Sequence, residues 1–199
     1  MRFRSFAVAG AALVLVAAVC FGQSAAKKMS TRPPAKSGAM PSMSMGPPPE
    51  MSKVSWLTGH WICSGRAFAS PMMGPAHPTE ATVAAGSELG GRWMVSHYRE
   101  KKTAQNAMPV EADEYWTYDT AEKKWDRIAL DNFGGWSSGD ATDWQNNALT
   151  WTSTGMMMGK KFQERATFTK KSDREVFYRG EIQGADGKWT PAWETTCRK

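Results

Sequence analysis

The chain is predicted to fold as an all-β, antiparallel up-and-down barrel that is closed by pairing of its first and last strands. Short runs rich in β-branched and aromatic residues alternate with turn sequences at near-even spacing, which predicts roughly ten strands. No window sustains an apolar stripe at helical spacing. A cysteine near each end of the series, Cys63 and Cys197, favours closure of the sheet on itself.

Turn residues set the expected bounds of each strand. Gly90-Gly91, Gly134-Gly135 and Asn146-Asn147 are typical of tight turns between adjacent strands. A short helix over Pro49–Leu57, ahead of the first strand, is compatible with the sequence. The strands are expected at 57–68, 79–89, 91–101, 111–119, 123–132, 135–143, 147–156, 160–170, 174–183 and 188–198.

The first 22 residues have the features of a secretory signal peptide. A basic start precedes the apolar run 6–21, which is too short for a confident membrane span, and small residues suit cleavage after Gly22 or Ala26. Lipidation at Cys20 is disfavoured, because Val19 stands where such sites carry a small residue. The protein is therefore expected to be exported, to the periplasm or beyond.

The composition changes sharply near residue 50. Residues 23–50 consist largely of Pro, Ser, Met, Lys and Gly, which cannot bury enough apolar surface to fold, so a disordered tether is expected. All ten tryptophans lie in 51–199, the predicted domain. No later segment is long and apolar enough for a transmembrane helix in the mature chain.

The positive charge of the chain lies mostly outside this domain. The formal net charge is +6, but residues 1–22 and 23–50 hold most of it and leave only +1 for 51–199. Acidic and basic residues are interspersed in the domain, without the basic patch that nucleic acids require. No nucleic-acid partner is expected.

The two domain cysteines are predicted to form a disulfide. By strand alternation Trp61 and Cys63 share one face, as do Trp193 and Cys197, so both thiols can point to the same side of neighbouring strands. An oxidising compartment would then join them. The alternative is two buried free cysteines that act as small apolar residues. Trp61 is expected to plug one end of the barrel.

A family resemblance supports the barrel. The segment Gly59-His60-Trp61 fits the Gly-x-Trp signature of lipocalin-like (calycin) barrels. With Leu57 before it, and Leu89-Gly90-Gly91-Arg92-Trp93 and Tyr118-Asp119 after it, the domain resembles a bacterial secreted family known only as a domain of unknown function, of the DUF1579 type. The resemblance implies a meandering barrel with a lumen, with Gly59, Trp61, Gly90, Gly91 and Arg92 as structural signature. It also implies Arg198 as the residue packed over Trp61, but no agreed chemistry. Thr117 departs from the family, which tends to have Gly there.

Aromatic residues and one histidine are the candidates for the lumen. Trp93, Trp116 and Trp193 are expected in the wall of an apolar pocket, although rings also fill small barrels completely. His97 is a candidate ligand for haem or a metal in the lumen. The alternative is a structural histidine with a polar partner.

Two further patterns give competing hypotheses. Methionines cluster in this exported chain, and thioether sulfur suits Cu(I), so copper binding by Met40, Met43, Met45, Met72, Met73 and His77 is an alternative. Met is equally an apolar filler. Gly135-Trp136-Ser137-Ser138-Gly139 matches a hydrolase elbow, but no helix is expected after it, so it is interpreted as part of a hairpin.

The leading functional prediction is non-enzymatic binding of a small apolar or amphipathic molecule in the lumen. A periplasmic copper-binding protein and an enzyme of unrecognised type are the alternatives. A cluster of buried titratable groups in the lumen would favour the enzyme, and a cavity would favour the binding protein.

Overall fold

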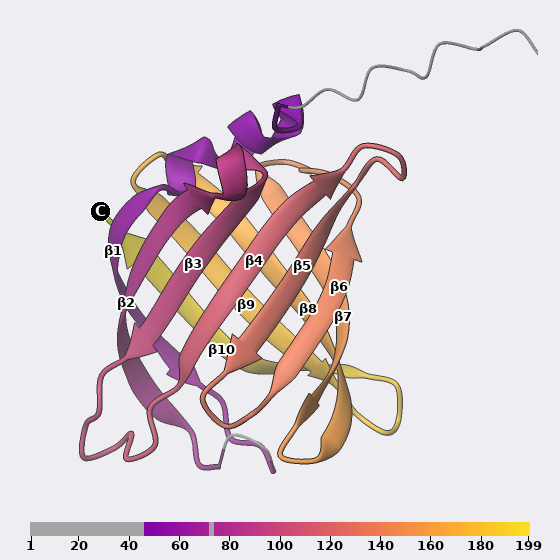
Figure 1. Ribbon diagram of the computed structural model, residues 1–199. Coiled ribbons are helices and arrows are strands. Elements are labelled where there is room, and N and C mark those ends of the chain that lie inside the picture. Colours follow the sequence, from indigo (N-terminus) through magenta and orange to yellow (C-terminus); the bar gives the residue numbers. More distant parts are fainter. Residues whose placement is uncertain (1–45, 72–73) are drawn as a thin grey trace, which may run out of the picture. The chain divides into compact units, whose positions relative to one another are not determined.

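Ten antiparallel strands form one closed barrel in the computed structural model, which describes residues 46–71 and 74–199 (Figure 1). Each lies within two residues of its predicted bounds, which confirms the all-β class and the strand count. Two short 3-10 helices precede β1 and β3: η1 (Pro49–Leu57) and η2 (Leu89–Gly91). The strands are β1 (Gly59–Ala67), β2 (His77–Glu88), β3 (Trp93–Glu100), β4 (Glu111–Asp119), β5 (Lys124–Asp131), β6 (Trp136–Ala141), β7 (Ala148–Met157), β8 (Lys160–Ser172), β9 (Glu175–Gln183) and β10 (Trp189–Arg198).

The barrel is a simple meander in which each strand pairs with its neighbours in sequence. Pairing of β1 with β10 closes it and places Cys63 directly opposite Cys197. The two residues form a disulfide, with their Cα atoms 4.0 Å apart. Both the predicted closure and the predicted disulfide are confirmed.

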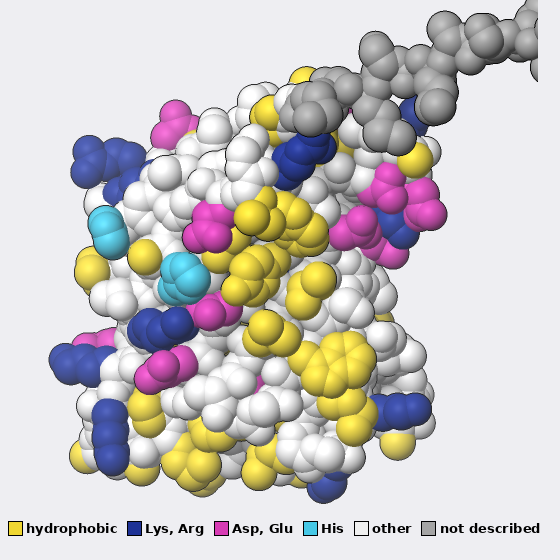
Figure 2. Space-filling model, viewed as in Figure 1, with side chains coloured by type: hydrophobic (Ala, Val, Ile, Leu, Met, Phe, Trp, Pro, Cys, Tyr) yellow, Lys and Arg dark blue, Asp and Glu magenta, His cyan; other side chains and the backbone are white. Residues whose placement is uncertain are grey.

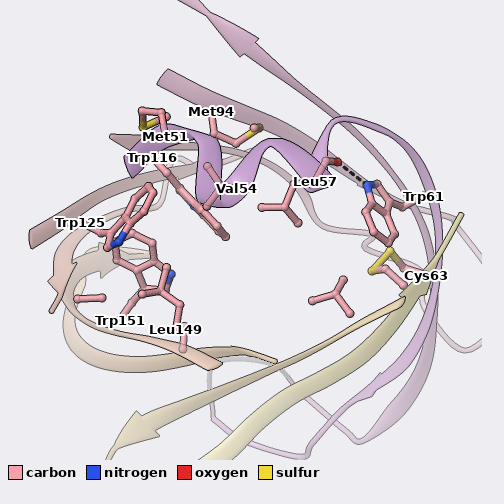
Figure 3. Close-up of a cluster of buried hydrophobic side chains, with 14 of the residues drawn as sticks. Met51, Val54, Leu57, Trp61, Cys63, Met94, Trp116, Trp125, Leu149 and Trp151 are labelled. Carbon is pink, nitrogen blue, oxygen red and sulfur yellow. Dashed lines mark hydrogen bonds between the residues drawn. A yellow bond between two sulfur atoms is a disulfide. The ribbon is translucent and has the colours of Figure 1, made fainter. Parts of the chain in front are cut away.

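Helix η1 covers one end of the barrel (Figure 1). Pro49 begins it, and the hydroxyls of Ser52 and Ser55 donate to carbonyls three residues earlier, which satisfies its backbone locally. Met51, Val54 and Leu57 are buried and lie over the tryptophans inside the barrel (Figure 3). This end is therefore sealed by apolar side chains, and we call it the closed end.

Trp61 joins this seal to the barrel wall. Its side chain is 2% exposed, and its Nε1 donates to the carbonyl of Leu57 at 2.7 Å. Lys199 Nζ lies 4.5 Å from the centre of the Trp61 ring and also donates to the carbonyl of Trp56. Arg198 instead faces outward and pairs with Glu175 at 2.9 Å. The role implied for Arg198 therefore belongs to Lys199, because Cys197 points inward and strand alternation turns its neighbour outward.

The glycine signature forms the turn between β2 and β3. Gly90 and Gly91 adopt left-handed φ angles of 70° and 85°, which glycine tolerates without strain. Thr117, at the position where the family tends to have glycine, donates its hydroxyl to the Arg92 carbonyl at 2.8 Å. This bond ties the turn to β4.

The predicted signal peptide, Cys20 and nearly all of the predicted tether lie outside the described residues. The first described element begins at Pro49, two residues before the predicted domain boundary. Among the described residues, no helix has the length and apolar character needed to cross a bilayer.

Candidate functional site

A cavity of about 1070 Å³ lies inside the barrel. Leu57, Trp61 and Met94 line its inner part, beneath the closed end. At the opposite end the lining includes Met108, Trp136 and Met158, whose side chains are 66%, 47% and 68% exposed. The cavity therefore opens to solvent at the end opposite η1. We call Met108, Trp136 and Met158 the mouth.

Four aromatic side chains form a continuous wall in the cavity. Trp116 on β4 meets Phe168 on β8 edge to face, with ring centres 4.6 Å apart. Phe168 stacks on Tyr178 of β9 at 4.1 Å, and Tyr178 meets Trp193 of β10 at 6.3 Å. All four line the cavity. Their rings give it a large apolar surface that offers π faces to a ligand.

Gly180 makes room for the last ring of this wall. A Cβ atom at this position would lie 2.0 Å from the Trp193 ring, which is closer than any real contact. Gly180 is the register partner of Trp193 on the neighbouring strand. The glycine therefore lets the indole lie against the barrel wall and leaves the centre of the lumen open.

A buried ion network crosses the lumen. Arg127 Nη1 donates to Glu164 at 2.9 Å, and Nη2 donates to Glu114 at 2.7 Å and to the Tyr178 hydroxyl at 3.3 Å. Arg127 and Glu164 are each 3% exposed. Burial acts to lower the pKa of Arg127, but the carboxylates of Glu114 and Glu164 more than offset this and raise it. Arg127 is therefore a fixed cation.

Small residues allow Arg127 on β5 to reach Glu164 on β8, three strands away around the barrel. On the inner face, Arg127 is paired with Gly139, Gly139 with Ser153, and Ser153 with Glu164. A Cβ atom on Gly139 would lie 2.4 Å from the Ser153 hydroxyl oxygen. The glycine and the serine thus leave the space that the ion pair between β5 and β8 spans.

A second polar group organises a loop near the mouth. Glu100 accepts hydrogen bonds from the Tyr98 hydroxyl at 3.0 Å, from Asn106 Nδ2 at 2.8 Å and from the backbone N–H of Val110 at 2.9 Å. Burial, together with the neighbouring Glu100 carboxylate, raises the pKa of Tyr98 well above its usual value. Tyr98 therefore stays a neutral donor at physiological pH, and the loop between β3 and β4 is held to the inner wall.

Two of the four candidate lumen residues lie in the lumen. Trp116 and Trp193 line the cavity, and their contact with a ligand stays a prediction. Trp93 does not line it, because its neighbour Met94 faces inward. The placement of Trp93 in the wall is therefore corrected. The outer face of β3 to β6 carries apolar side chains of its own, visible as a yellow band in Figure 2. On β5, Ile128 and Leu130 are exposed.

His97 lies on the outer face of β3. Its Nδ1 is 2.9 Å from Asp113 Oδ1, and Arg99 Nη1 is 2.8 Å from the same oxygen. Partial burial acts to raise the pKa of Asp113, but the hydrogen bonds from His97 and Arg99 hold it below its usual value. A ring on this face does not reach a haem or metal held in the lumen. The placement of His97 as a lumen ligand is corrected, and it has the polar partner of a structural histidine.

The copper hypothesis stays a prediction. Met40, Met43, Met45, Met72 and Met73 lie outside the described residues. His77 is described, and its Nδ1 lies 2.9 Å from the carbonyl of Pro75. Within the described ranges 46–71 and 74–199, no group of three or more His, Cys, Asp or Glu side chains is arranged to hold a metal ion. The Gly-x-Ser-x-Gly segment forms the start of β6, as its hairpin interpretation expects.

The ion network was missed by the sequence analysis, although a signal for it exists. Glu164 shares the inner face of β8 with Ala166 and Phe168, and Arg127 shares that of β5 with Trp125 and Ala129. A charged residue at an apolar position of an alternating strand indicates a buried ionic group that needs a partner.

Comparison with known proteins gives a family and one solved structure of similar fold. A solved structure from M. tuberculosis, that of Rv2717c, superposes with a TM-score of 0.61 at 11% identity over 77% of this chain and 98% of that one. A redesigned β-barrel, b11L5F_LGL, gives a TM-score of 0.38 at 10% identity over 73% of this chain and 93% of that one. No curated protein matches the chain. The family model described as "Protein of unknown function (DUF1579)" matches residues 47–199, and the chain therefore belongs to the DUF1579 family.

Proposed function

We propose that the barrel binds a small amphipathic molecule in its lumen. The observation that carries this proposal is the cavity of about 1070 Å³ that opens at the mouth. Sites for small molecules are concave, about 300–1,000 Å³ in volume, mostly apolar, and supplied with a few fixed polar groups. The wall of Trp116, Phe168, Tyr178 and Trp193 beside the network of Arg127 has this composition. A lumen filled by aromatic rings would leave no such space.

Two adjacent serines provide a direct test. Ser137 is buried and lines the cavity, whereas Ser138 is exposed on the outer face of the same strand. We expect Ser137→Phe to fill part of the lumen and to weaken binding at least tenfold. Ser138→Phe introduces the same ring outside the lumen and is expected to leave binding unchanged.

The ligand is best identified by native mass spectrometry of protein isolated from its own host. A retained small molecule, absent from the Ser137→Phe protein and present on the Ser138→Phe protein, is the expected result. Equal occupancy of the two variants would move the binding site out of the lumen. A protein of bare polypeptide mass, together with no response of tryptophan fluorescence to any added amphiphile, would contradict the proposal.

Catalysis in the same lumen is the second candidate function. The observation that favours it is the buried cluster of titratable groups formed by Glu114, Arg127, Glu164 and Tyr178. The ion pairs occupy these groups, which favours a structural or recognition role over proton transfer. Incubation of the recovered ligand with protein separates the two functions, because a binding protein returns it chemically unchanged.

We also propose that the protein works outside the cytosol. The disulfide between Cys63 and Cys197 supports this, because such bonds persist in oxidising compartments. The signal-like features of residues 1–22 point the same way. Determination of the mature N-terminus tests it, and the expected start lies after Gly22 or Ala26. An intact Met1 on cytosolic protein would overturn it.

A further inference from the structure

We propose that the lumen ligand is an organic cation: an ammonium or amidinium group on an apolar body, with the charged group at Glu114 and Glu164. This inference rests on the proposed lumen binding and adds the chemical class of the ligand. Four observations carry it: the charge of the lining, the engagement of Arg127, the unpartnered polar atoms, and the aromatic wall.

The lining of the cavity is strongly acidic. Among the described residues that line it, Arg127 is the only Arg or Lys and His77 the only histidine, whereas the acidic ones are Glu100, Glu114, Asp131, Glu164 and Glu194. Glu194 is neutralised by Arg66 at 2.8 Å, and Asp131 accepts the backbone N–H groups of its own turn. Of the other three, Glu114 and Glu164 share one guanidinium, and Glu100 accepts hydrogen bonds from neutral donors. A cavity with apolar walls focuses such a negative field on whatever enters it.

The Arg127 guanidinium is already paired with two carboxylates. Nη1 is bonded to Glu164, and Nη2 to Glu114 and to Tyr178. Its Nε is enclosed and has no hydrogen-bond partner. A carboxylate ligand would add a third negative charge beside Glu114 and Glu164, which already share the single positive charge of Arg127. The network therefore selects against fatty-acid-like ligands.

A carboxylate oxygen and a hydroxyl oxygen of the cavity lining also have no hydrogen-bond donor. Glu164 uses Oε1 for Arg127, and no described residue donates to its Oε2. The Thr195 hydroxyl oxygen is enclosed and unpartnered, and Thr195 lines the cavity as the register partner of Tyr178. Buried polar atoms without partners are uncommon in native proteins, and an ionised carboxylate oxygen such as Glu164 Oε2 can only accept a hydrogen bond. An ammonium group supplies both the donors and the charge.

The aromatic wall suits the same ligand. Trp116, Tyr178 and Trp193 line the cavity, and the first two lie beside the ion network: Trp116 Nε1 donates to Glu114 at 3.2 Å, and Tyr178 contacts Arg127. Aromatic faces attract cations, most strongly where water is excluded. Carboxylates and rings together form the chemistry by which proteins recognise substituted ammonium groups.

Three ligands with the same tail test the charge. Decyltrimethylammonium, decanol and decanoate are titrated into the oxidised full chain below their micellar concentrations, with binding followed by calorimetry. We expect the cation to bind at least tenfold more tightly than decanol, and decanoate to bind no more tightly than decanol. Equal affinities for all three would leave lumen binding intact and overturn the charge preference. If decanoate bound most tightly, the lumen would prefer an anion and the proposed preference for a cation would be wrong. If no probe bound, the lumen-binding function would be contradicted as well.

A matched pair of variants locates the charge. Glu164→Gln removes one lumen carboxylate and keeps its shape, and we expect the preference for the cation over decanol to fall at least fivefold. Glu111→Gln removes a carboxylate from the exposed outer end of β4 and is expected to leave the preference unchanged. If Glu164→Gln kept the full preference for the cation over decanol, the charged group of the ligand would not lie at Glu164. Should Glu164→Gln not fold, Glu114→Gln and the wild-type probe series decide the question.

Discussion

At the closed end of the barrel, Met51, Val54, Leu57 and Trp61 are buried, whereas at the mouth Met108, Trp136 and Met158 expose large apolar side chains. The same residue types thus have opposite surroundings at the two ends. At the closed end each apolar side chain gains burial, which stabilises by about 25 cal/mol per Å². At the mouth the apolar side chains remain in water and contribute little to folding.

The first and last elements of the described barrel also meet at the closed end. The disulfide joins β1 to β10, Lys199 contacts η1 and Trp61, and Lys53 of η1 pairs with Asp143 at 2.7 Å. Several ties between residues distant in the sequence therefore lie where the barrel is sealed. The comparison indicates that stability is concentrated at the closed end and that ligand access lies at the mouth. Four predictions test this division, from the largest effect to the smallest.

Loss of the disulfide is expected to have the largest effect. The bond encloses a sequence separation of 134 residues. In the chain-entropy model a loop of this size contributes on the order of 4–5 kcal/mol, through restriction of the unfolded chain. The double variant Cys63→Ala with Cys197→Ala should lose this amount in urea unfolding. Dithiothreitol should destabilise the wild-type protein similarly and leave the double variant unchanged. If dithiothreitol left the unfolding free energy of the wild-type protein unchanged, the prediction would be contradicted.

Two tryptophan truncations compare the ends directly. Trp61→Ala should destabilise the protein by about 3–5 kcal/mol, because it leaves a cavity that the η1 cap and the strands cannot collapse into. Trp136→Ala removes the same side chain from the mouth and should change stability by no more than about 0.5 kcal/mol. Chemical denaturation of both variants measures the difference. Equal denaturation midpoints for the two variants would show that the two ends of the barrel contribute equally to stability.

The strands could be predicted from the sequence because their signals are local. Turns such as Asn146-Asn147, with φ angles of 49° and 63°, sit between runs that alternate with period two. Closure was also predictable, because two cysteines at the ends of the series constrain which strands can meet. The helix η1 was compatible with the sequence, but its function as a cap depends on contacts with residues distant in the chain.

The faces of the strands could not all be predicted. Strand β3 carries apolar residues on both faces, Trp93 and Val95 outward and Met94 and Tyr98 inward. Alternation indicates which residues share a face but not which face is inside. Trp93 and His97 were misplaced for this reason. Arg198 was expected over Trp61 because the sequence does not distinguish it from the adjacent basic residue, Lys199. The ion network depends on register across four strands, which no local pattern contains.

The last two residues of the chain give a smaller, matched comparison. Lys199 donates to the carbonyls of Trp56 and Thr58 at 2.6 and 2.7 Å and lies over Trp61, whereas Arg198 makes a surface pair with Glu175. We expect Lys199→Ala to cost about 1 kcal/mol through loss of charged hydrogen bonds and the cation–π contact. Arg198→Ala should cost less than about 0.5 kcal/mol. If Arg198→Ala lowered the melting temperature more than Lys199→Ala, Arg198 rather than Lys199 would be the residue that stabilises the packing of Trp61.

The smallest expected effect comes from the salt bridge between Lys53 of η1 and Asp143 in the loop after β6. Its contribution to stability is expected to depend on pH. Partial burial acts to raise the pKa of Asp143, but hydrogen bonds from Lys53, from the Trp144 backbone N–H and from Trp125 Nε1 hold it below its usual value.

A carboxyl group whose folded pKa is lowered stabilises the protein above its unfolded pKa, about 3.9, and loses that contribution as the pH falls through the folded value. Both partners are partly exposed, so solvent screening limits the pair to about 0.2–1 kcal/mol. We therefore expect Asp143→Asn to be less stable than the wild-type protein at pH 7 and the gap to narrow below about pH 4. Asp186→Asn, which removes an exposed carboxylate beside Lys188 in the turn between β9 and β10, controls for general acid effects. A gap that stays constant from pH 7 to pH 3 would show that Asp143 holds the cap by shape and neutral hydrogen bonds rather than by its charge.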